Sequence, residues 1–92
     1  MAINTDTISE VGTTTPYSWT GGEGAAIGTG FSGAIVELEY SLDDTNYASV
    51  GGEGILKTDG GFGFTLPACS IRWRMTANNP SDSTVTLSVE NV

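Results

Sequence analysis

The stretch that decides the fold is Ala34-Ile35-Val36-Glu37-Leu38-Glu39-Tyr40-Ser41-Leu42. Even positions from 36 to 42 are apolar or aromatic, and odd positions from 37 to 41 are polar. Because side chains alternate between the two faces of a β-strand, this pattern predicts a strand with one buried face and one solvated face. Turn residues follow at 43–46, so residues 47–50 are predicted to return as the second strand of a hairpin.

The same alternation recurs further along the chain. Residues 71–76 and 84–90 alternate on either side of a turn-forming run, which predicts an antiparallel hairpin. Residues 55–58 and 62–66 flank Asp59-Gly60-Gly61, which predicts another hairpin. Residues 13–20 could form one more strand, which Pro16 would confine to a sheet edge or a strand start.

Composition supports the same fold class. The chain has 92 residues, enough for one small domain, and its 13 glycines, 13 threonines and nine serines favour turns and strands over helices. Several short strands with frequent turns predict an all-β protein, a small antiparallel β-sandwich of the immunoglobulin-like or jelly-roll-like kind, in preference to a barrel. Residues 13–92 form this single domain. Residues 1–12 have no sustained period and are predicted to form a flexible N-terminal arm that orders on a partner.

Charge limits the function. Eleven acidic side chains against three basic ones give a net charge of -8, which argues against binding of nucleic acid. The chain has no histidine and one lysine, so most acid–base and nucleophilic chemistry is missing and we expect no catalytic residue. Glu37 and Glu39 would lie about 7 Å apart on one strand face. We expect them to contact solvent, or to pair with Arg72 and Arg74 if the two strands are neighbours.

The remaining candidate ligands also favour structural roles. The lone Cys69 can form no internal disulfide, and without histidine partners it makes no zinc site. Asp43, Asp44 and Asn46 lack the spacing of a calcium loop and are predicted to form a turn. We therefore expect neither metal nor cofactor. The sequence has no recognisable signal peptide and no apolar stretch of about 20 residues, so we expect no membrane partner.

Two groups of residues are candidates for contact with a partner protein. Tyr17 and Trp19 are aromatic residues near a predicted edge, and exposed aromatic side chains anchor interfaces or stack on sugars. Apolar residues in the predicted arm could order against a partner in the same way, and these are Ile3, Ile8 and Val11.

Residues 35–47, together with 64–67 and 71–76, resemble the small β-sandwich accessory proteins of tailed-bacteriophage virions. In that family a Tyr-Ser-x-Asp strand end leads into a tight turn, as in Tyr40-Ser41-Leu42-Asp43 here. A later Ile/Val-Arg-x-Arg strand precedes a last hairpin, as in Ile71-Arg72-Trp73-Arg74. The resemblance covers residues 35–89, and fibronectin-like and other immunoglobulin-like modules share the motif. The family includes capsid decoration (cement) proteins, head fibres and tail modules, and offers no catalytic residue to carry over.

The resemblance implies a non-enzymatic capsid decoration protein that binds the outer surface of the shell and stabilises it. Its partner would be the major capsid protein or another virion protein, and it would form a homo-oligomer, with a trimer favoured. It would be made in the host cytoplasm and located on the capsid exterior, where its negative charge lies away from packaged DNA. The arm at 1–12 could add a strand to a shell subunit. The alternatives are a carbohydrate-binding or tail-associated adhesion module that uses exposed Tyr17 and Trp19, and, far behind, a glycosidase built on Glu37 and Glu39.

Overall fold

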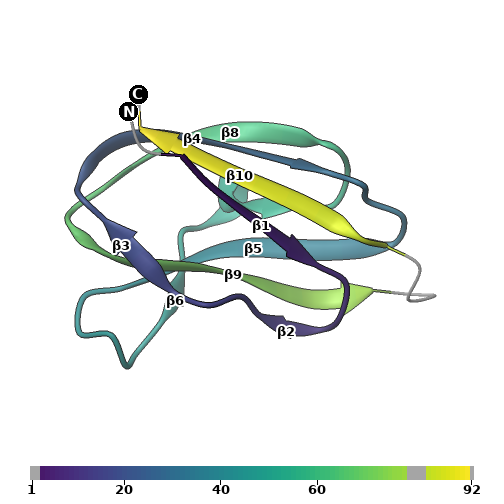
Figure 1. Cartoon of the computed structure of the whole chain (residues 1–92), viewed down its shortest axis with the longest axis horizontal. Helices are drawn as coiled ribbons and strands as arrows, with labels where there is room; N and C mark the ends of the chain where they lie inside the picture. Colours follow the sequence, from purple (N-terminus) through teal and green to yellow (C-terminus); the bar gives the residue numbers. More distant parts are fainter. Residues whose placement is uncertain (1–2, 79–82, 92) are drawn as a thin grey trace.

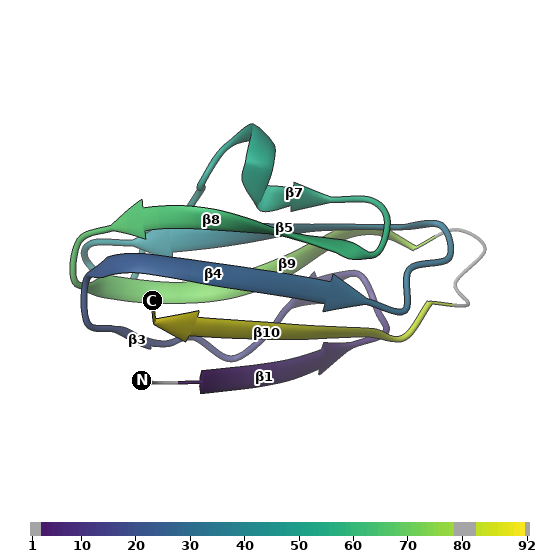
Figure 2. The same ribbon diagram turned by 90° about the horizontal axis from the view of Figure 1, so that it is seen from above.

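The computed structural model describes residues 3–78 and 83–91, except for the side chains of Ile3 and Glu53. Two antiparallel β-sheets pack face to face, as expected for a small all-β sandwich (Figures 1 and 2). The first sheet contains, in spatial order, β1 (Ile3–Ile8), β10 (Val85–Asn91), β4 (Gly22–Thr29) and β8 (Gly60–Leu66).

The second sheet is built on two long neighbouring strands, β5 (Ala34–Ser41) and β9 (Cys69–Asn78). Short strands extend it on both sides. β2 (Gly12–Thr13) and β3 (Tyr17–Trp19) pair with β9, whereas β6 (Ala48–Ser49) and β7 (Ile55–Leu56) pair with β5. A 3-10 turn, η1 (Gly52–Gly54), lies between β6 and β7. The predicted hairpin after the first motif is confirmed, because β5 and β6 are antiparallel neighbours.

The core lies between the sheets and follows the predicted alternation. Along β9, Ile71, Trp73 and Met75 are fully buried, and along β10 Val85 and Leu87 are fully buried. Four aromatic rings form a continuous series through this core, with successive centroids 5.0, 6.0 and 6.1 Å apart; they belong to Trp19, Phe64, Phe62 and Trp73. The large rings fill space that a chain with few aliphatic residues would otherwise leave empty.

Two predicted hairpins are wrong. β9 and β10 lie in different sheets, and so do β7 and β8. Their apolar faces do point into one core, as expected, but across the sandwich and not side by side. Alternation identifies which face of a strand is buried, yet it is the same for a neighbour in the sheet and for a strand in the opposite sheet.

Polar side chains occupy the corners where the chain passes between sheets. The Asp59 carboxylate accepts hydrogen bonds from the backbone N–H groups of Gly30 and Phe31, both at 3.0 Å. The Asn78 amide donates to the carbonyl oxygens of Ser9 at 2.9 Å and Ser83 at 3.2 Å. These contacts satisfy backbone groups that a hairpin ladder would otherwise pair. The turn signal at Asp59 therefore marks a corner.

The expected N-terminal arm is also corrected. Residues 3–8 form β1, which pairs with β10 over its whole length, from Ile3 opposite Glu90 to Ile8 opposite Val85. Ile8 is 8% exposed and belongs to the core, while Asn4 and Asp6 share its inward-facing positions and are half-buried. Polar residues at these inward positions hide the period-two pattern, so the strand was not predicted. Residues 12 and 13 form β2, so this region is part of the sandwich.

Replacement of Gly24 by alanine tests the packing of the rings. A Cβ atom there would lie 2.5 Å from Trp19 Cη2 and 2.6 Å from Phe64 Cζ, so the rings must move. We expect Gly24→Ala to lower the free energy of unfolding by about 1–3 kcal/mol, as for other overpacked cores. Chemical denaturation measures this change. Gly63→Ala is the matched control, because its Cβ would meet only the Gly24 carbonyl oxygen at 3.7 Å. Equal midpoints for the two variants would contradict this account of the core.

Candidate functional site

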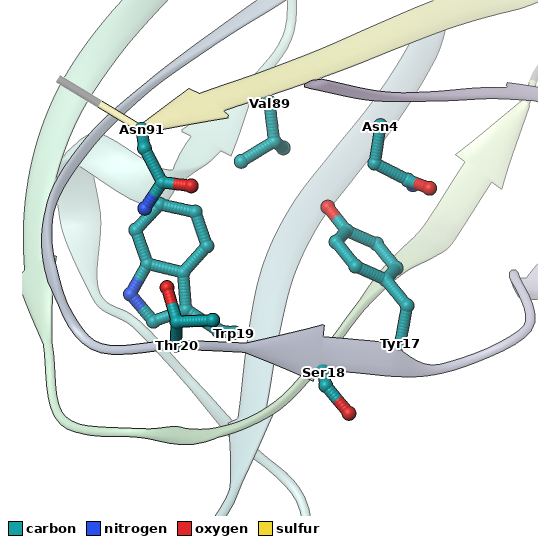
Figure 3. A pocket seen from close by; sticks show the side chains of 7 residues that line it. All are labelled: Asn4, Tyr17, Ser18, Trp19, Thr20, Val89 and Asn91. Carbon is teal, nitrogen blue, oxygen red and sulfur yellow. The ribbon is translucent and has the colours of Figure 1, made fainter. Parts of the chain in front are cut away.

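Two of the five sequence-predicted partner residues, Tyr17 and Trp19, lie at one end of the sandwich, where β3 faces β1 and β10. Tyr17 and Trp19 project from the inner face of β3, and Ser18 points away (Figure 3). Together with side chains of the first sheet they line a cavity of about 150 Å³; its walls are Asn4, Tyr17, Ser18, Trp19, Thr20, Val89 and Asn91. The walls combine aromatic rings with amide and hydroxyl groups, and none of them carries a formal charge.

The structure separates the five predicted partner residues. Trp19 is 4% exposed and packs on Phe64, so it does not offer the open face for stacking on a sugar that the carbohydrate-binding alternative requires. Ile8 is likewise a core residue, whereas Val11 is 65% exposed beyond β1. Tyr17 is half-buried at the cavity, and the side chain of Ile3 lies outside the described part. The chain has few large apolar residues, so the core takes most of them.

Burial dominates the electrostatics of the cavity. It raises the pKa of Tyr17 to about 12; the Asn4 amide opposes this increase and the Asp6 carboxylate reinforces it. Burial also raises the pKa of Asp6, although Asn4 donates a hydrogen bond to it at 2.9 Å. The Tyr17 hydroxyl and the Trp19 indole N–H have no hydrogen-bond partner among the described residues. The cavity therefore favours neutral groups.

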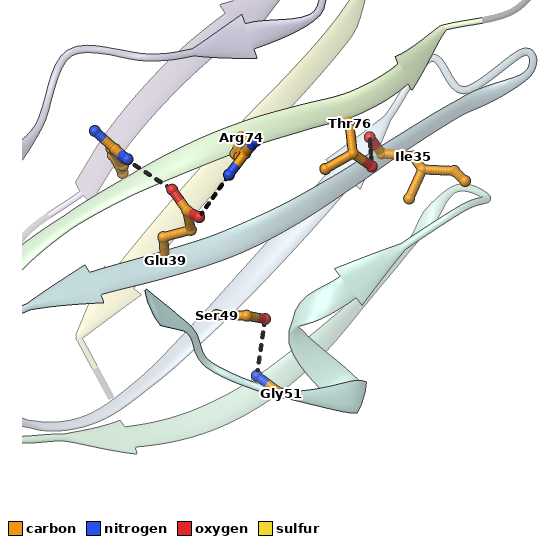
Figure 4. Close-up of polar contacts among 7 residues, drawn as sticks. Ile35, Glu39, Ser49, Gly51, Arg74 and Thr76 are labelled. Carbon is orange, nitrogen blue, oxygen red and sulfur yellow. Dashed lines mark hydrogen bonds and ion pairs between the residues drawn. The ribbon is translucent and has the colours of Figure 1, made fainter. Parts of the chain in front are cut away.

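The candidate carboxylate pair has a structural role. β5 and β9 place Glu37 opposite Arg74 and Glu39 opposite Arg72, as expected for neighbouring strands. Glu39 accepts a hydrogen bond from Arg72 Nε at 2.9 Å and lies 3.7 Å from a terminal nitrogen of Arg74 (Figure 4). The Arg72 guanidinium also stacks 3.8 Å above the centroid of the Tyr47 ring. Only 5% of the Glu39 side chain is exposed, so this carboxylate, expected to be solvated, is instead covered on the outer face of the sheet.

In the acidic turn after β5, the carboxylate oxygen atoms accept hydrogen bonds from other groups of the same chain. Asp43 Oδ1 accepts hydrogen bonds from the backbone N–H groups of Thr45 at 2.9 Å and Asn46 at 2.8 Å. These bonds, with further ones from the Asn46 and Ser41 side chains, hold the pKa of Asp43 well below its usual range. Asp44 accepts a hydrogen bond from the Ser70 hydroxyl. In the described part of the chain there is no group of three or more His, Cys, Asp or Glu side chains that could hold a metal ion.

Cys69 is half-buried at the start of β9, and burial raises the pKa of its thiol. A raised pKa keeps the thiol protonated near neutral pH, where it is a poor nucleophile. Its position fits the predicted packing role.

A second hollow was not predicted from the sequence. It is a groove of about 460 Å³ between β8 and the segment around η1, with Tyr40, Val50 and Phe62 among its walls. Glycines 51, 52, 54 and 63 leave it open. The alternation of glycine with phenylalanine in residues 60–64 is the one signal that could have indicated it, because glycine in a strand often marks the close approach of another backbone.

Comparison with known proteins identifies no relative: no family model, no curated protein and no solved structure matches this chain. Among the described residues, no helix is long and apolar enough to cross a membrane.

Replacement of Tyr17 by phenylalanine tests the cavity. The hydroxyl has no partner to lose, so we expect Tyr17→Phe to leave the free energy of unfolding at pH 7 unchanged or to raise it by up to about 1 kcal/mol. In the wild type, the neutral phenol contributes stability below pH 10 that is lost as the pH rises from 10 through 12, because the folded pKa is the higher one. The variant should lack this loss. Denaturation at pH 7 and pH 11 measures both effects, and a loss of more than 1 kcal/mol at pH 7 would contradict the absence of a partner.

Replacement of Glu39 by glutamine tests the covered ion pair. The amide cannot balance the charge of Arg72, whose side chain is only 24% exposed, so we expect a loss of about 1–3 kcal/mol in the free energy of unfolding. Glu37→Gln is the matched control on the same strand face; Glu37 forms no ion pair among the described residues and should change stability by less than about 0.5 kcal/mol. If denaturation experiments give the same change in the free energy of unfolding for both variants, the Glu39–Arg72 ion pair contributes no more than an exposed ion pair does.

Proposed function

We propose that this protein is a non-enzymatic structural protein of a tailed-bacteriophage virion, most specifically a capsid decoration protein that binds the outer surface of the shell and stabilises it. Its partner would be the major capsid protein or another virion protein, and it would act as a homo-oligomer, with a trimer favoured. A bound partner that contacts several shell subunits stabilises the assembled form by mass action, without any chemical step.

The observation that carries this proposal is that residues 35–47 and 71–76 of the family resemblance form one structural unit, whereas residues 64–67 lie at the end of β8 in the first sheet. Its two motif segments are the neighbouring strands β5 and β9 at the centre of the second sheet. The Tyr-Ser-x-Asp end of β5 leads into the turn held by Asp43, and the hydrogen bond from Ser70 to Asp44 ties that turn to the start of β9. The motif residues that resemble the family therefore contact one another in the folded chain. A chance resemblance at scattered positions would not require such contacts.

The charge distribution supports an outward location. Two of the three basic side chains, Arg72 and Arg74, lie against Glu39 on the outer face of the second sheet. Because both arginines lie against the same glutamate, most acidic side chains have no basic side chain beside them. The chain keeps a net charge of -8, which would repel packaged DNA. A decoration protein on the capsid exterior avoids this repulsion. The sequence has no histidine to serve as a base beside a nucleophile.

Co-sedimentation with expanded, undecorated phage capsids tests the proposal. We expect the purified protein, sized first by light scattering, to saturate the capsids at a fixed ratio to the shell subunit and to raise their melting temperature. Capsids that already carry their full set of decoration protein are the control and should bind much less. Equal binding to both kinds of capsid, or no binding to either at micromolar concentration, would overturn the assignment.

A further inference from the structure

The open edge of β8 differs from the other sheet edges. β8 is the last strand of the first sheet and pairs only with β4 among the described strands. Edge strands are usually protected by charge, proline, a bulge or short length. The second sheet has edge strands of only two or three residues, and β1, the other long edge, carries Asp6. β8 has seven residues, no charge and no proline, and its register with β4 is unbroken.

Backbone groups on β8 point outward at this edge. The carbonyl oxygens of Ala26 and Gly24 reach toward β8, 2.6 Å and 3.7 Å from where Cβ atoms of Gly61 and Gly63 would lie. In an antiparallel pair, a carbonyl that points across in this way flanks a non-hydrogen-bonded pair of residues. The pairs 25/63 and 27/61 are therefore of this kind, so the N–H and C=O groups of Gly61, Gly63 and Thr65 face away from β4.

Hollows lie on both sides of the same edge. The groove described above, with walls of Tyr40, Val50 and Phe62, lies on the inner side. A shallower hollow of about 520 Å³ lies on the outer side, where Glu23 is part of the wall. Both hollows share Gly63, Phe64 and Thr65. An added strand directs alternate side chains to opposite faces, so it would place them in turn in the inner groove and beside the outer hollow, which lies over β4 and β8.

The fold itself does not require glycine at position 63. A Cβ there would make only an ordinary contact, and its backbone does not have the positive φ that favours glycine. Glycine in the interior of a strand weakens the strand, and one recognised reason for its presence is close approach by another backbone. Gly61 differs, because the Ala26 carbonyl leaves no room for a Cβ atom.

The surroundings favour a single extended segment over a second copy of this chain. Figure 2 shows η1 and β7 projecting beyond β8. This projecting segment, residues 52–56, borders the edge of β8 on one side. Two copies joined edge to edge through β8 would bring their projecting segments, as well as their charges of -8, toward each other. A single strand that lies along the projecting segment avoids both the steric conflict and the charge repulsion.

We propose that β8 is the acceptor edge for an extended segment of a partner protein, which adds to the first sheet as a further strand. Its inward side chains are apolar and fill the groove beside Tyr40, Val50 and Phe62. Its outward side chains are neutral or basic, because Glu23 lies in the outer hollow and the whole chain is acidic. The inference goes beyond the proposed function, since it holds whichever protein supplies the segment.

A short peptide of alternating lysine and valine, blocked at both ends and long enough to cover β8, serves as the probe. A peptide of the same composition with its lysines grouped together is the charge-matched control. We expect the alternating peptide to shift the NMR amide signals of Gly61, Gly63 and Thr65 and to slow their hydrogen exchange, while amides on the open edge of β1 stay unchanged.

Gly63→Pro removes one outward N–H and no bond to β4, and proline is tolerated at a sheet edge. We expect it to weaken binding of the alternating peptide by about tenfold or more, whereas Gly63→Ala, which keeps the N–H and adds only a Cβ atom, should weaken binding by a smaller factor than Gly63→Pro does. Equal binding of both peptides, perturbation confined to β1 or to scattered acidic residues, or no perturbation at millimolar peptide would overturn the proposal. Unchanged binding by a folded Gly63→Pro variant would overturn it as well. The amide shifts of the wild type decide the question if that variant does not fold.

Discussion

Four aromatic rings hold the two sheets of this protein together. Trp19 and Trp73 belong to the second sheet, and the rings of Phe62 and Phe64 between them belong to the first. In a chain of 92 residues with few large aliphatic side chains, this series supplies much of the volume of the core. Strand β4 lies beside the rings and must leave room for them. This explains the glycine at position 24, where a Cβ atom would collide with the rings of Trp19 and Phe64.

The demand for a filled core also decides which residues remain for function. Trp19 and Ile8, two of the five predicted partner residues, belong to the interior, whereas Val11 is exposed and Tyr17 is half-buried at the cavity. The outer face of the second sheet is likewise occupied by its own contacts, with Glu39 held between two arginines. The edge of β8 does remain open, beside the groove lined by Tyr40, Val50 and Phe62, which is where we propose that a partner strand adds.

The polar corners explain how so small a sandwich crosses repeatedly between its sheets. Asp59 and Asn78 each hydrogen-bond to backbone groups of other segments, so side chains stabilise the chain at the ends of strands that pass to the other sheet. The turn held by Asp43 works in the same way after β5. These hydrogen bonds matter because a buried backbone group without a hydrogen-bond partner lowers stability by more than a single hydrogen bond raises it.

The sequence by itself determined the all-β class, the buried faces of β5, β9 and β10 and the β5–β6 hairpin, because period-two alternation and turn residues are local properties. The pairing of Glu39 with Arg72 depends on β5 and β9 being neighbours, which alternation leaves open. Only the tertiary structure decided that β7 and β8, and β9 and β10, lie in opposite sheets, and that residues 3–8 are a strand and not an arm. It also decided that Trp19 is buried and that β8 has an open edge beside a groove. Alternation marks the inward face of a strand but carries no information about its partner, which depends on contacts between residues far apart in the chain.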